Sequence, residues 1–280
     1  MFMRISVIVA VYNRSDLVRR CLISLNEQSH RPAEVVLCDD GSDEDIMGAV
    51  RDIAGQLAYG IIYVRQEHRG FRLAKSKNNG IRHSTGSYLI FNDQDIIHSR
   101  DYLQTFVRHH RKRQFLVAYP VRFTPEQMIR LADGMAVDEL ITTRQIRKVR
   151  RQYRKDSLEY MLGHLWGRNR YRLKLRGGVF GIAREDLLCV DGFDENYQGW
   201  GHEDDDLGRR LYRAGISGRN VFCQQFPIHL YHQPHHAAGF RTNQAYYQRR
   251  IREIRQGDCR AVRGLSQTED DEQIRVVHMQ

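Results

Sequence analysis

The sequence has few of the features that mark a secreted, a zinc-binding or a membrane-spanning protein. Its five cysteines are widely spaced over 280 residues, and no two of them form a CxxC pair. This spacing is typical of reduced, mostly buried thiols in a cytoplasmic protein. No apolar run approaches the ~20 residues of a membrane-spanning helix, and the run near the N-terminus is too short for a signal peptide. We therefore expect a cytoplasmic protein that meets a membrane only peripherally, at its inner face.

Internal repeats and low-complexity linkers are also absent, which favours a single compact domain. A chain of 280 residues, 41% of them apolar, is long enough for one large α/β domain. We expect this domain to cover residues 1–260, with a basic helical insert at 140–176. Residues 261–280 are polar, and we expect them to form a tail that is frayed from about Gly264.

Negative charge is in short supply, since 34 Asp and Glu residues face 44 Lys and Arg residues and the net charge is +10. This excess predicts anionic partners: nucleoside diphosphates, nucleic acid or an anionic membrane surface. The charge permits a basic nucleic-acid-binding protein without catalysis, which is our alternative hypothesis. No common DNA- or RNA-binding signature supports it. Residues 144–176 hold a dense basic run interleaved with aromatic side chains such as Tyr153 and Trp166. This run can lie on an anionic surface, or it can be an ordinary solvated helix face.

Apolar, β-branched runs alternate with helical patterns over the first hundred residues. The expected strands there cover residues 5–11, 34–38, 60–64 and 87–91. This alternation is the pattern of a doubly wound, mostly parallel α/β sheet flanked by helices. In such sheets ligands bind beyond the carboxyl ends of the strands. The polar segments at these ends, residues 12–14, 39–42 and 93–95, should therefore converge on one site.

The run from Gly199 to Asp206, GWGHEDDD, places four carboxylates next to one another. Adjacent like charges raise one another's pKa and favour a nearby cation, so the run suits deprotonation of a hydroxyl or cation binding. The glycines allow close approach to a ligand, and Trp200 offers a flat apolar wall. The alternative is an acidic first turn that stabilises the dipole of a helix continuing through Leu207. Because that alternative leaves Trp200 and the glycines unexplained, we favour the functional interpretation.

Two further segments suit a divalent cation. Asp93 and Asp95 are two positions apart in an expected extended segment, so both carboxylates should face one ion such as Mg²⁺ or Mn²⁺. The run from His229 to His236 contains four imidazoles, which are good ligands for manganese-like ions, and it follows an expected strand at 220–222. Zinc is disfavoured because no cysteine lies at ligand spacing.

A glycine-rich segment, GGVFGIA, covers residues 177–183. It lacks the Lys-Ser/Thr of a phosphate-binding P-loop. Its glycines indicate either a close approach of the backbone to a ligand or a tight turn before a packed strand.

Taken in order, these segments resemble a known family. The runs SVIVAVYNRSDLVRRCLISLNEQ, VVLCDDGSDED and RLAKSKNNGIRHSTGSYLIFNDQD look like the nucleotide-binding half of the family-two glycosyltransferases, which have the GT-A fold. Residues 176–215 are similar to the C-terminal half of the β-1,4-galactosyltransferases and of bacterial chondroitin- and hyaluronan-type polymerases. The resemblance covers residues 4 to about 245. It implies a Rossmann-like GT-A domain with a nucleotide-binding half at 1–100 and an acceptor and catalytic half at 101–260.

The resemblance also implies roles for single residues. Tyr12 and Arg14 would line the nucleotide, Asp39 would accept a hydrogen bond from the base, and Gly178 would border the donor sugar. Lys77, where many members carry Arg, or Arg72 would contact the diphosphate. The implied metal ligands are Asp95, Asp93, which could instead touch the ribose, and His232, which matches better than His229. On the acceptor side, Trp200 would wall the acceptor, Asp204 would be the catalytic base and Glu203 would orient the acceptor.

The implied activity is that of a metal-dependent, inverting glycosyltransferase. It would use a nucleotide sugar, with UDP as the expected nucleotide and Mn²⁺ or Mg²⁺ as the cofactor. The acceptor would be a hydroxyl of a glycan or glycolipid in bacterial surface polysaccharide or lipopolysaccharide synthesis. Metal and basic residues would neutralise the leaving diphosphate while Asp204 takes the acceptor proton.

Overall fold

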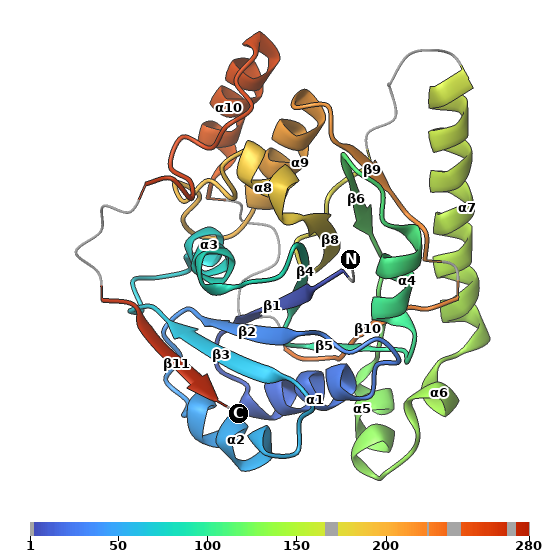
Figure 1. Ribbon diagram of the computed structural model, residues 1–280. Coiled ribbons are helices and arrows are strands. Elements are labelled where there is room, and N and C mark those ends of the chain that lie inside the picture. Colours follow the sequence, from blue (N-terminus) through green and yellow to red (C-terminus); the bar gives the residue numbers. More distant parts are fainter. Residues whose placement is uncertain (1–2, 166–172, 223, 234–241, 268–272, 280) are drawn as a thin grey trace.

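A computed structural model describes residues 3–165, 173–222, 224–233, 242–267 and 273–279. Its centre is an eight-stranded sheet in the order β11-β3-β2-β1-β4-β8-β6-β9 (Figure 1). The four strands β3, β2, β1 and β4 are parallel, and β8 pairs antiparallel with β4 and β6. The strands are β1 (Ile5–Val11), β2 (Glu34–Asp39), β3 (Gly60–Arg65), β4 (Tyr88–Asp93), β6 (Gln114–Val117), β8 (Val179–Ala183), β9 (Ser217–Arg219) and β11 (Arg275–Met279). The expected mostly parallel α/β sheet is confirmed.

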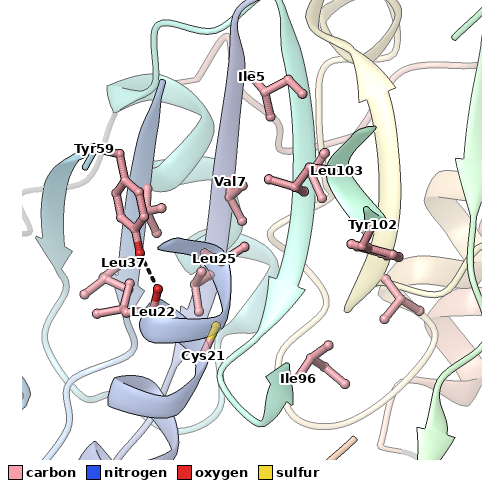
Figure 2. Packing of buried hydrophobic residues seen from close by; sticks show 14 of the residues in the cluster. Ile5, Val7, Cys21, Leu22, Leu25, Leu37, Tyr59, Ile96, Tyr102 and Leu103 are labelled. Carbon is pink, nitrogen blue, oxygen red and sulfur yellow. Dashed lines mark hydrogen bonds between the residues drawn. The ribbon is translucent and has the colours of Figure 1, made fainter. Parts of the chain in front are cut away.

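Helices cover both faces of the parallel part of this sheet (Figure 1). All seven residues of β1 are buried, as its continuous apolar run predicts. On one face, α1 packs Leu22 and Leu25 near Val7, and the Tyr59 hydroxyl donates a 2.7 Å hydrogen bond to the Leu22 carbonyl (Figure 2). On the other face α3 contacts β1 and β2. The helices around the sheet are α1 (Ser15–Asn26), α2 (Ile46–Ala54), α3 (Leu73–His83), α4 (Tyr102–His109), α8 (Arg184–Cys189) and α9 (Glu203–Arg213). α10 (Gln244–Gln256) packs on α9.

A second, three-stranded sheet has the order β5-β10-β7. It is formed by β5 (Ile96–His98), β10 (Pro227–His229) and β7 (Val121–Arg122). Beside it lie α5 (Pro125–Ala132), α6 (Val137–Leu140) and the long α7 (Thr143–Leu165). A separate apolar cluster, with Phe123, Val149 and Ile228 among its members, joins this sheet to the helices.

Three local expectations are wrong. Residues 220–222 are not a strand: the strand is β9, just before them, and His229 itself ends β10. Gln94 and Asp95 form a turn between β4 and β5 rather than an extended segment. The tail is not frayed throughout, because β11 pairs antiparallel with β3 along five residue pairs and covers that edge of the sheet.

The parallel strands end side by side, which sets the position of the site. Val11 lies opposite Asp39 in the β1–β2 register, and Ala10 lies opposite Asp93 in the β1–β4 register. The polar segments after β1, β2 and β4 therefore meet at one edge of the sheet, as expected. Within the described part of the chain, no helix is both long and apolar enough to cross a membrane.

Candidate active site

A cavity of about 880 Å³ opens at the carboxyl ends of β1 and β4. Its volume lies within the range of pockets that bind small molecules and cofactors. Most of the residues that the resemblance singles out line it, and they come from segments as far apart in the sequence as Tyr12 and His232. These lining residues are Tyr12, Arg14, Lys77, Asp93, Asp95, Gly178, Trp200, Glu203, Asp204 and His232.

Asp95 and two histidines form a cluster of metal-ligating groups at one side of the cavity. One ligand atom each from Asp95, His229 and His232 lies within 4.8 Å of the others. Nε2 of His232 is 2.6 Å from Oδ2 of Asp95, and Nε2 of His229 is 3.6 Å from the same oxygen. The hydrogen bond to Asp95 raises the pKa of His232, whereas burial lowers the pKa of His229.

This cluster fits a divalent cation. Oδ1 of Asp95 is buried and has no hydrogen-bond partner among the described residues. A carboxylate with two imidazoles is a donor set that suits manganese-like ions. Both His229 and His232 are therefore candidate ligands. The other two histidines of the run, His235 and His236, lie outside the described residues.

Lys77, from α3, is buried among the acidic groups. Its Nζ lies 3.7 Å from Oδ1 of Asp204 and 5.2 Å from the ring centre of Phe193. Burial alone would lower the pKa of Lys77, but the charges of Asp204, Asp93 and Glu203 raise it above its usual value. Burial raises the pKa of Asp93 in spite of the opposing charge of Lys77. Lys77 thus stays a cation at neutral pH and can attract an anionic diphosphate.

Glu203 and Asp204 form the first turn of α9 at the cavity wall. Oδ2 of Asp204 accepts a 2.9 Å hydrogen bond from the backbone N–H of Gly177, and this side chain is 27% exposed. Glu203 is buried, and burial together with the charge of Asp204 raises its pKa to about 7. The two neighbouring carboxylates therefore have different surroundings. Asp204 faces the cation of Lys77 and the backbone N–H of Gly177, whereas Glu203 has a pKa close to 7.

The glycine pair before β8 is required by these carboxylates. A Cβ added at Gly177 would lie 2.1 Å from Oδ1 of Asp204, and one added at Gly178 would lie 1.9 Å from Oδ2 of Asp93. Real Cβ atoms do not approach other atoms so closely. The glycines thus permit a close approach of both carboxylates to the backbone.

The loop that carries Trp200 is held by the start of α10. Gly199, Gly201 and His202 all have positive φ, a conformation that favours glycine at the first two positions. The side-chain amide of Asn243 donates to the carbonyls of Gly199 and Gly201 at 3.2 and 3.0 Å. Trp200 is 42% exposed at the cavity, where its ring can contact a bound sugar.

Tyr12 and His68 contribute a flat pair of rings to the cavity lining. Tyr12 stacks on His68 with ring centres 5.0 Å apart and planes 20° from parallel. Gln94 holds the Tyr12 backbone from both sides, since it accepts from the Tyr12 N–H and donates to the Tyr12 carbonyl, both at 2.9 Å. Arg14 lies beside this pair, and its guanidinium donates to the Gln233 carbonyl at 2.9 Å. The stacked rings of Tyr12 and His68 suit a planar ring of a ligand, and the guanidinium of Arg14 suits an anionic group attached to it.

Two expected site residues are not brought to the cavity. Asp39 is 1% exposed, and its oxygens accept hydrogen bonds from Ser42 and from the Tyr63 hydroxyl. Arg72 is buried, and its guanidinium donates to the Glu67 carbonyl. Neither residue is among those that line the cavity.

Asp40, the residue after Asp39, lines the cavity instead. It accepts from the Arg72 N–H at 2.8 Å and from the Gln66 amide at 2.6 Å, and burial raises its pKa. The only hint of this in the sequence is that two carboxylates stand together in the loop after β2. The sequence gives no comparable hint for His68 or for Asn243, because each acts through a partner distant in the sequence.

Comparison with known proteins agrees with this geometry. The model of the glycosyl transferase family 2 matches residues 6–175, more than half of the chain. The chain belongs to this family. A second model, described as the N-terminal domain of galactosyltransferase, matches residues 163–235, which include the GWGHEDDD run.

Several curated enzymes are similar to this glycosyltransferase. A chondroitin synthase of Escherichia coli is 27% identical over 78% of this chain and 33% of its own length. A validoxylamine A glucosyltransferase of Streptomyces hygroscopicus is 27% identical over 84% of this chain and 53% of its own length. A hyaluronan synthase of Pasteurella multocida is 27% identical over 80% of this chain. The chain spans a quarter to about half of the length of these relatives.

Solved glycosyltransferase structures share the fold. Staphylococcus aureus TarS, residues 1–349, in complex with UDP-GlcNAc aligns with a TM-score of 0.62 and 16% identity over 94% of this chain and 69% of that chain. A mannosyltransferase of Pyrobaculum calidifontis, in complex with GDP-Man and Mn²⁺, aligns with a TM-score of 0.56 and 20% identity over 85% of this chain and 59% of that chain. The fold is therefore GT-A, as the resemblance implies.

Proposed function

We propose that this glycosyltransferase is a metal-dependent, inverting enzyme that transfers a sugar from a UDP sugar to a hydroxyl of a glycan or glycolipid. The observation that carries the proposal is that Asp95 and His232 of the metal-ligating cluster line the same cavity as the carboxylates of Glu203 and Asp204. The first group suits the leaving diphosphate and the second suits the acceptor. A solved neighbour with UDP-GlcNAc and another with GDP-Man and Mn²⁺ support a nucleotide-sugar donor.

The donor is proposed to lie against the wall formed by Tyr12 and His68. The base would stack near these rings, and Asp40 takes over the base contact that the sequence assigned to Asp39, because Asp40 reaches the cavity. Arg14 and Lys77 supply positive charge for the diphosphate, and Gly178 leaves room for the sugar beside Asp93. Arg72 is assigned no direct contact.

Asp95, His229 and His232 would hold Mn²⁺ or Mg²⁺, with Asp93 beside them. When bound, such an ion stabilises the negative charge that develops on a leaving diphosphate. Lys77 supplies a second positive charge, close enough to Asp93 and Asp204 that their charges raise its pKa. The protein's own groups thus lower the cost of separating charge at the donor.

Asp204 is proposed as the general base. It accepts the proton of the acceptor hydroxyl, whose oxygen forms a bond to the anomeric carbon as the bond to the diphosphate breaks. A single displacement from the face opposite the leaving group inverts the anomeric configuration. Trp200 would support the acceptor ring, and Glu203, with its pKa near neutrality, would orient the acceptor by hydrogen bonding.

The decisive experiment begins with a screen of nucleotide sugars for thermal stabilisation and hydrolysis in the presence of manganese. With the donor that responds, Asp204→Asn should retain donor affinity in calorimetry and lose transfer. The matched control is Asp205→Asn, one residue along the same helix, because Asp205 pairs with Lys174 at 2.9 Å. Retained turnover in Asp204→Asn would remove Asp204 as the base. Full activity after EDTA treatment would remove the metal from the proposal.

The alternative of a nucleic-acid-binding protein without catalysis is tested by the same calorimetry. We expect saturable UDP binding and weak binding to DNA or RNA at physiological salt. Tight nucleic-acid binding with no response to any nucleotide sugar would favour the alternative.

We further propose the organisation and location of the enzyme. Residues 1–100 would form the nucleotide-binding half and 101–260 the acceptor half, since the cavity takes Tyr12 to Asp95 from the first and Gly178 to His232 from the second. The enzyme would act in the cytoplasm, peripherally at the inner face of the membrane, in surface polysaccharide or lipopolysaccharide synthesis.

A further inference from the structure

We propose that the outer face of α7 docks on a membrane surface that carries anionic lipids. This inference deepens the membrane location proposed above and rests on it. It uses residues that are remote from the cavity and that the catalytic proposal does not employ.

The charge of α7 is strongly one-sided. Between Thr143 and Leu165 the helix holds seven Lys or Arg residues and two acids, so it carries a net +5 of the chain's +10. All seven basic side chains are exposed. Of the two acids, Asp156 is buried and Glu159 lies 3.9 Å from Lys155. The seven basic residues are Arg144, Arg147, Lys148, Arg150, Arg151, Arg154 and Lys155.

Exposed apolar side chains share the same face. Arg147, Arg151, Arg154, Leu158 and Met161 follow one another at spacings of three and four, so they form one stripe along the helix. Leu158 is 52% exposed and Met161 is 50% exposed. A basic stripe that ends in exposed apolar side chains has the composition of helices that lie in a membrane interface. The apolar residues favour a lipid surface over nucleic acid, which offers charge alone on its outside.

The opposite face fixes the helix to the protein. Val149 is buried in the apolar cluster beneath the helix. Asp156, about two helical turns after Val149, accepts hydrogen bonds of 2.9 Å from the side-chain amides of Asn220 and Gln152. The Gln145 amide donates to the Arg122 carbonyl in β7 at 2.7 Å. The basic face is therefore presented by a helix that is fixed to the protein between Gln145 and Asp156. Figure 1 shows this helix at the side of the molecule.

The contact of α7 with β7 links the proposed membrane-binding helix to the active site. The helix contacts β7, and Arg122 of β7 lies opposite His229 of β10 in the parallel register. His229 is in turn part of the candidate metal cluster. A membrane bound to α7 would thus be joined to the active site through one small sheet, which would keep a lipid-linked acceptor near the enzyme.

The test is cosedimentation of the whole protein with vesicles made of equal parts phosphatidylcholine and phosphatidylglycerol, compared with phosphatidylcholine alone. A basic residue at an anionic membrane strengthens binding about fivefold, so R147Q/R151Q/R154Q should weaken vesicle binding about 100-fold. The matched control, R249Q/R252Q/R255Q, removes the same charge from exposed positions of α10 and should change binding much less. L158S/M161S should also weaken vesicle binding, while leaving binding to duplex DNA unchanged.

Three outcomes would overturn the inference. These are no binding of the unaltered protein to the anionic vesicles, an equal loss in the α10 control, and unchanged vesicle binding in L158S/M161S. Transfer to a soluble acceptor is measured on the same variants and should stay unchanged. Loss of vesicle binding without loss of transfer therefore concerns α7 alone, whereas absence of transfer in the unaltered protein concerns the proposed function.

Discussion

Replacing Gly177 by alanine should disable the enzyme without unfolding it. The new Cβ would lie 2.1 Å from Oδ1 and 2.4 Å from Oδ2 of Asp204, whereas ordinary contacts begin at 3.4 Å. The carboxylate must therefore move by roughly 1 Å or more, and a displacement of that size can cost about 100-fold in rate. The same movement breaks the 2.9 Å hydrogen bond from the Gly177 N–H. Gly177 does not have a positive φ, so alanine brings no backbone strain of its own.

The assay is steady-state transfer to a soluble acceptor, with donor affinity measured separately by calorimetry. We expect kcat to fall about 100-fold, and we expect donor affinity and the melting temperature to change little. Gly55→Ala is the matched control, because a Cβ there has no atom within 4 Å and φ is again negative. If Gly177→Ala kept the kcat of the control, the position of Asp204 against this backbone would not matter for catalysis, and the reasoning would be refuted.

Two further predictions concern Glu203, at the start of α9, and the Trp200 loop that precedes this helix. The pKa of Glu203 is raised from 4.5 to about 7 in the folded protein, so its ionisation costs stability that grows as pH rises between these values. Glu203→Gln should then leave stability at pH 4 nearly unchanged and raise it by up to about 3 kcal/mol at pH 8; equal effects in urea unfolding at both pH values would contradict this. Asn243→Ala removes both hydrogen bonds that hold the Trp200 loop, so the acceptor KM should rise about tenfold at constant donor affinity. An unchanged KM, or the same rise in the exposed control Gln248→Ala, would exclude Asn243 as a positioning residue.

The parallel half of the fold could be predicted from the sequence because its signals are local. The buried run of β1 and the helical stripe of α1 each specify an element without reference to the rest of the chain. The expectations for 220–222 and for the polar tail failed for the opposite reason. β9 needs the edge of β6, and β11 needs the edge of β3, so both strands are decided by partners distant in the sequence.

The site shows the same division between local and distant information. Asp93, Asp95 and the histidine run could be singled out as candidates because their residue types suit a cation, while only the resemblance favours His232 within that run. The structure brings Asp95, His229 and His232 into one cluster. Asp39 and Asp40 could not be told apart, since both are carboxylates in one loop. The difference lies in Tyr63 on the neighbouring strand, whose hydroxyl donates a hydrogen bond to the Asp39 carboxylate. Only the three-dimensional arrangement shows that Asp40 is the residue turned to the cavity.

The four adjacent carboxylates at the start of α9 are tolerated because each has a different environment. Asp206 is fully buried against Arg210 at 2.6 Å, and Asp205 pairs with Lys174. Asp206 therefore serves the fold, since a buried ion pair that loses one partner leaves an uncompensated charge.

Asp204 and Glu203 remain for the cavity, and their surroundings differ. The Oδ1 of Asp204 lies 3.7 Å from Nζ of Lys77, and its Oδ2 accepts the Gly177 N–H. Glu203 is buried, and burial together with the charge of Asp204 raises its pKa to about 7. A Glu203 that keeps its proton to higher pH places less negative charge beside Asp204, the proposed base, and can donate a hydrogen bond to the acceptor.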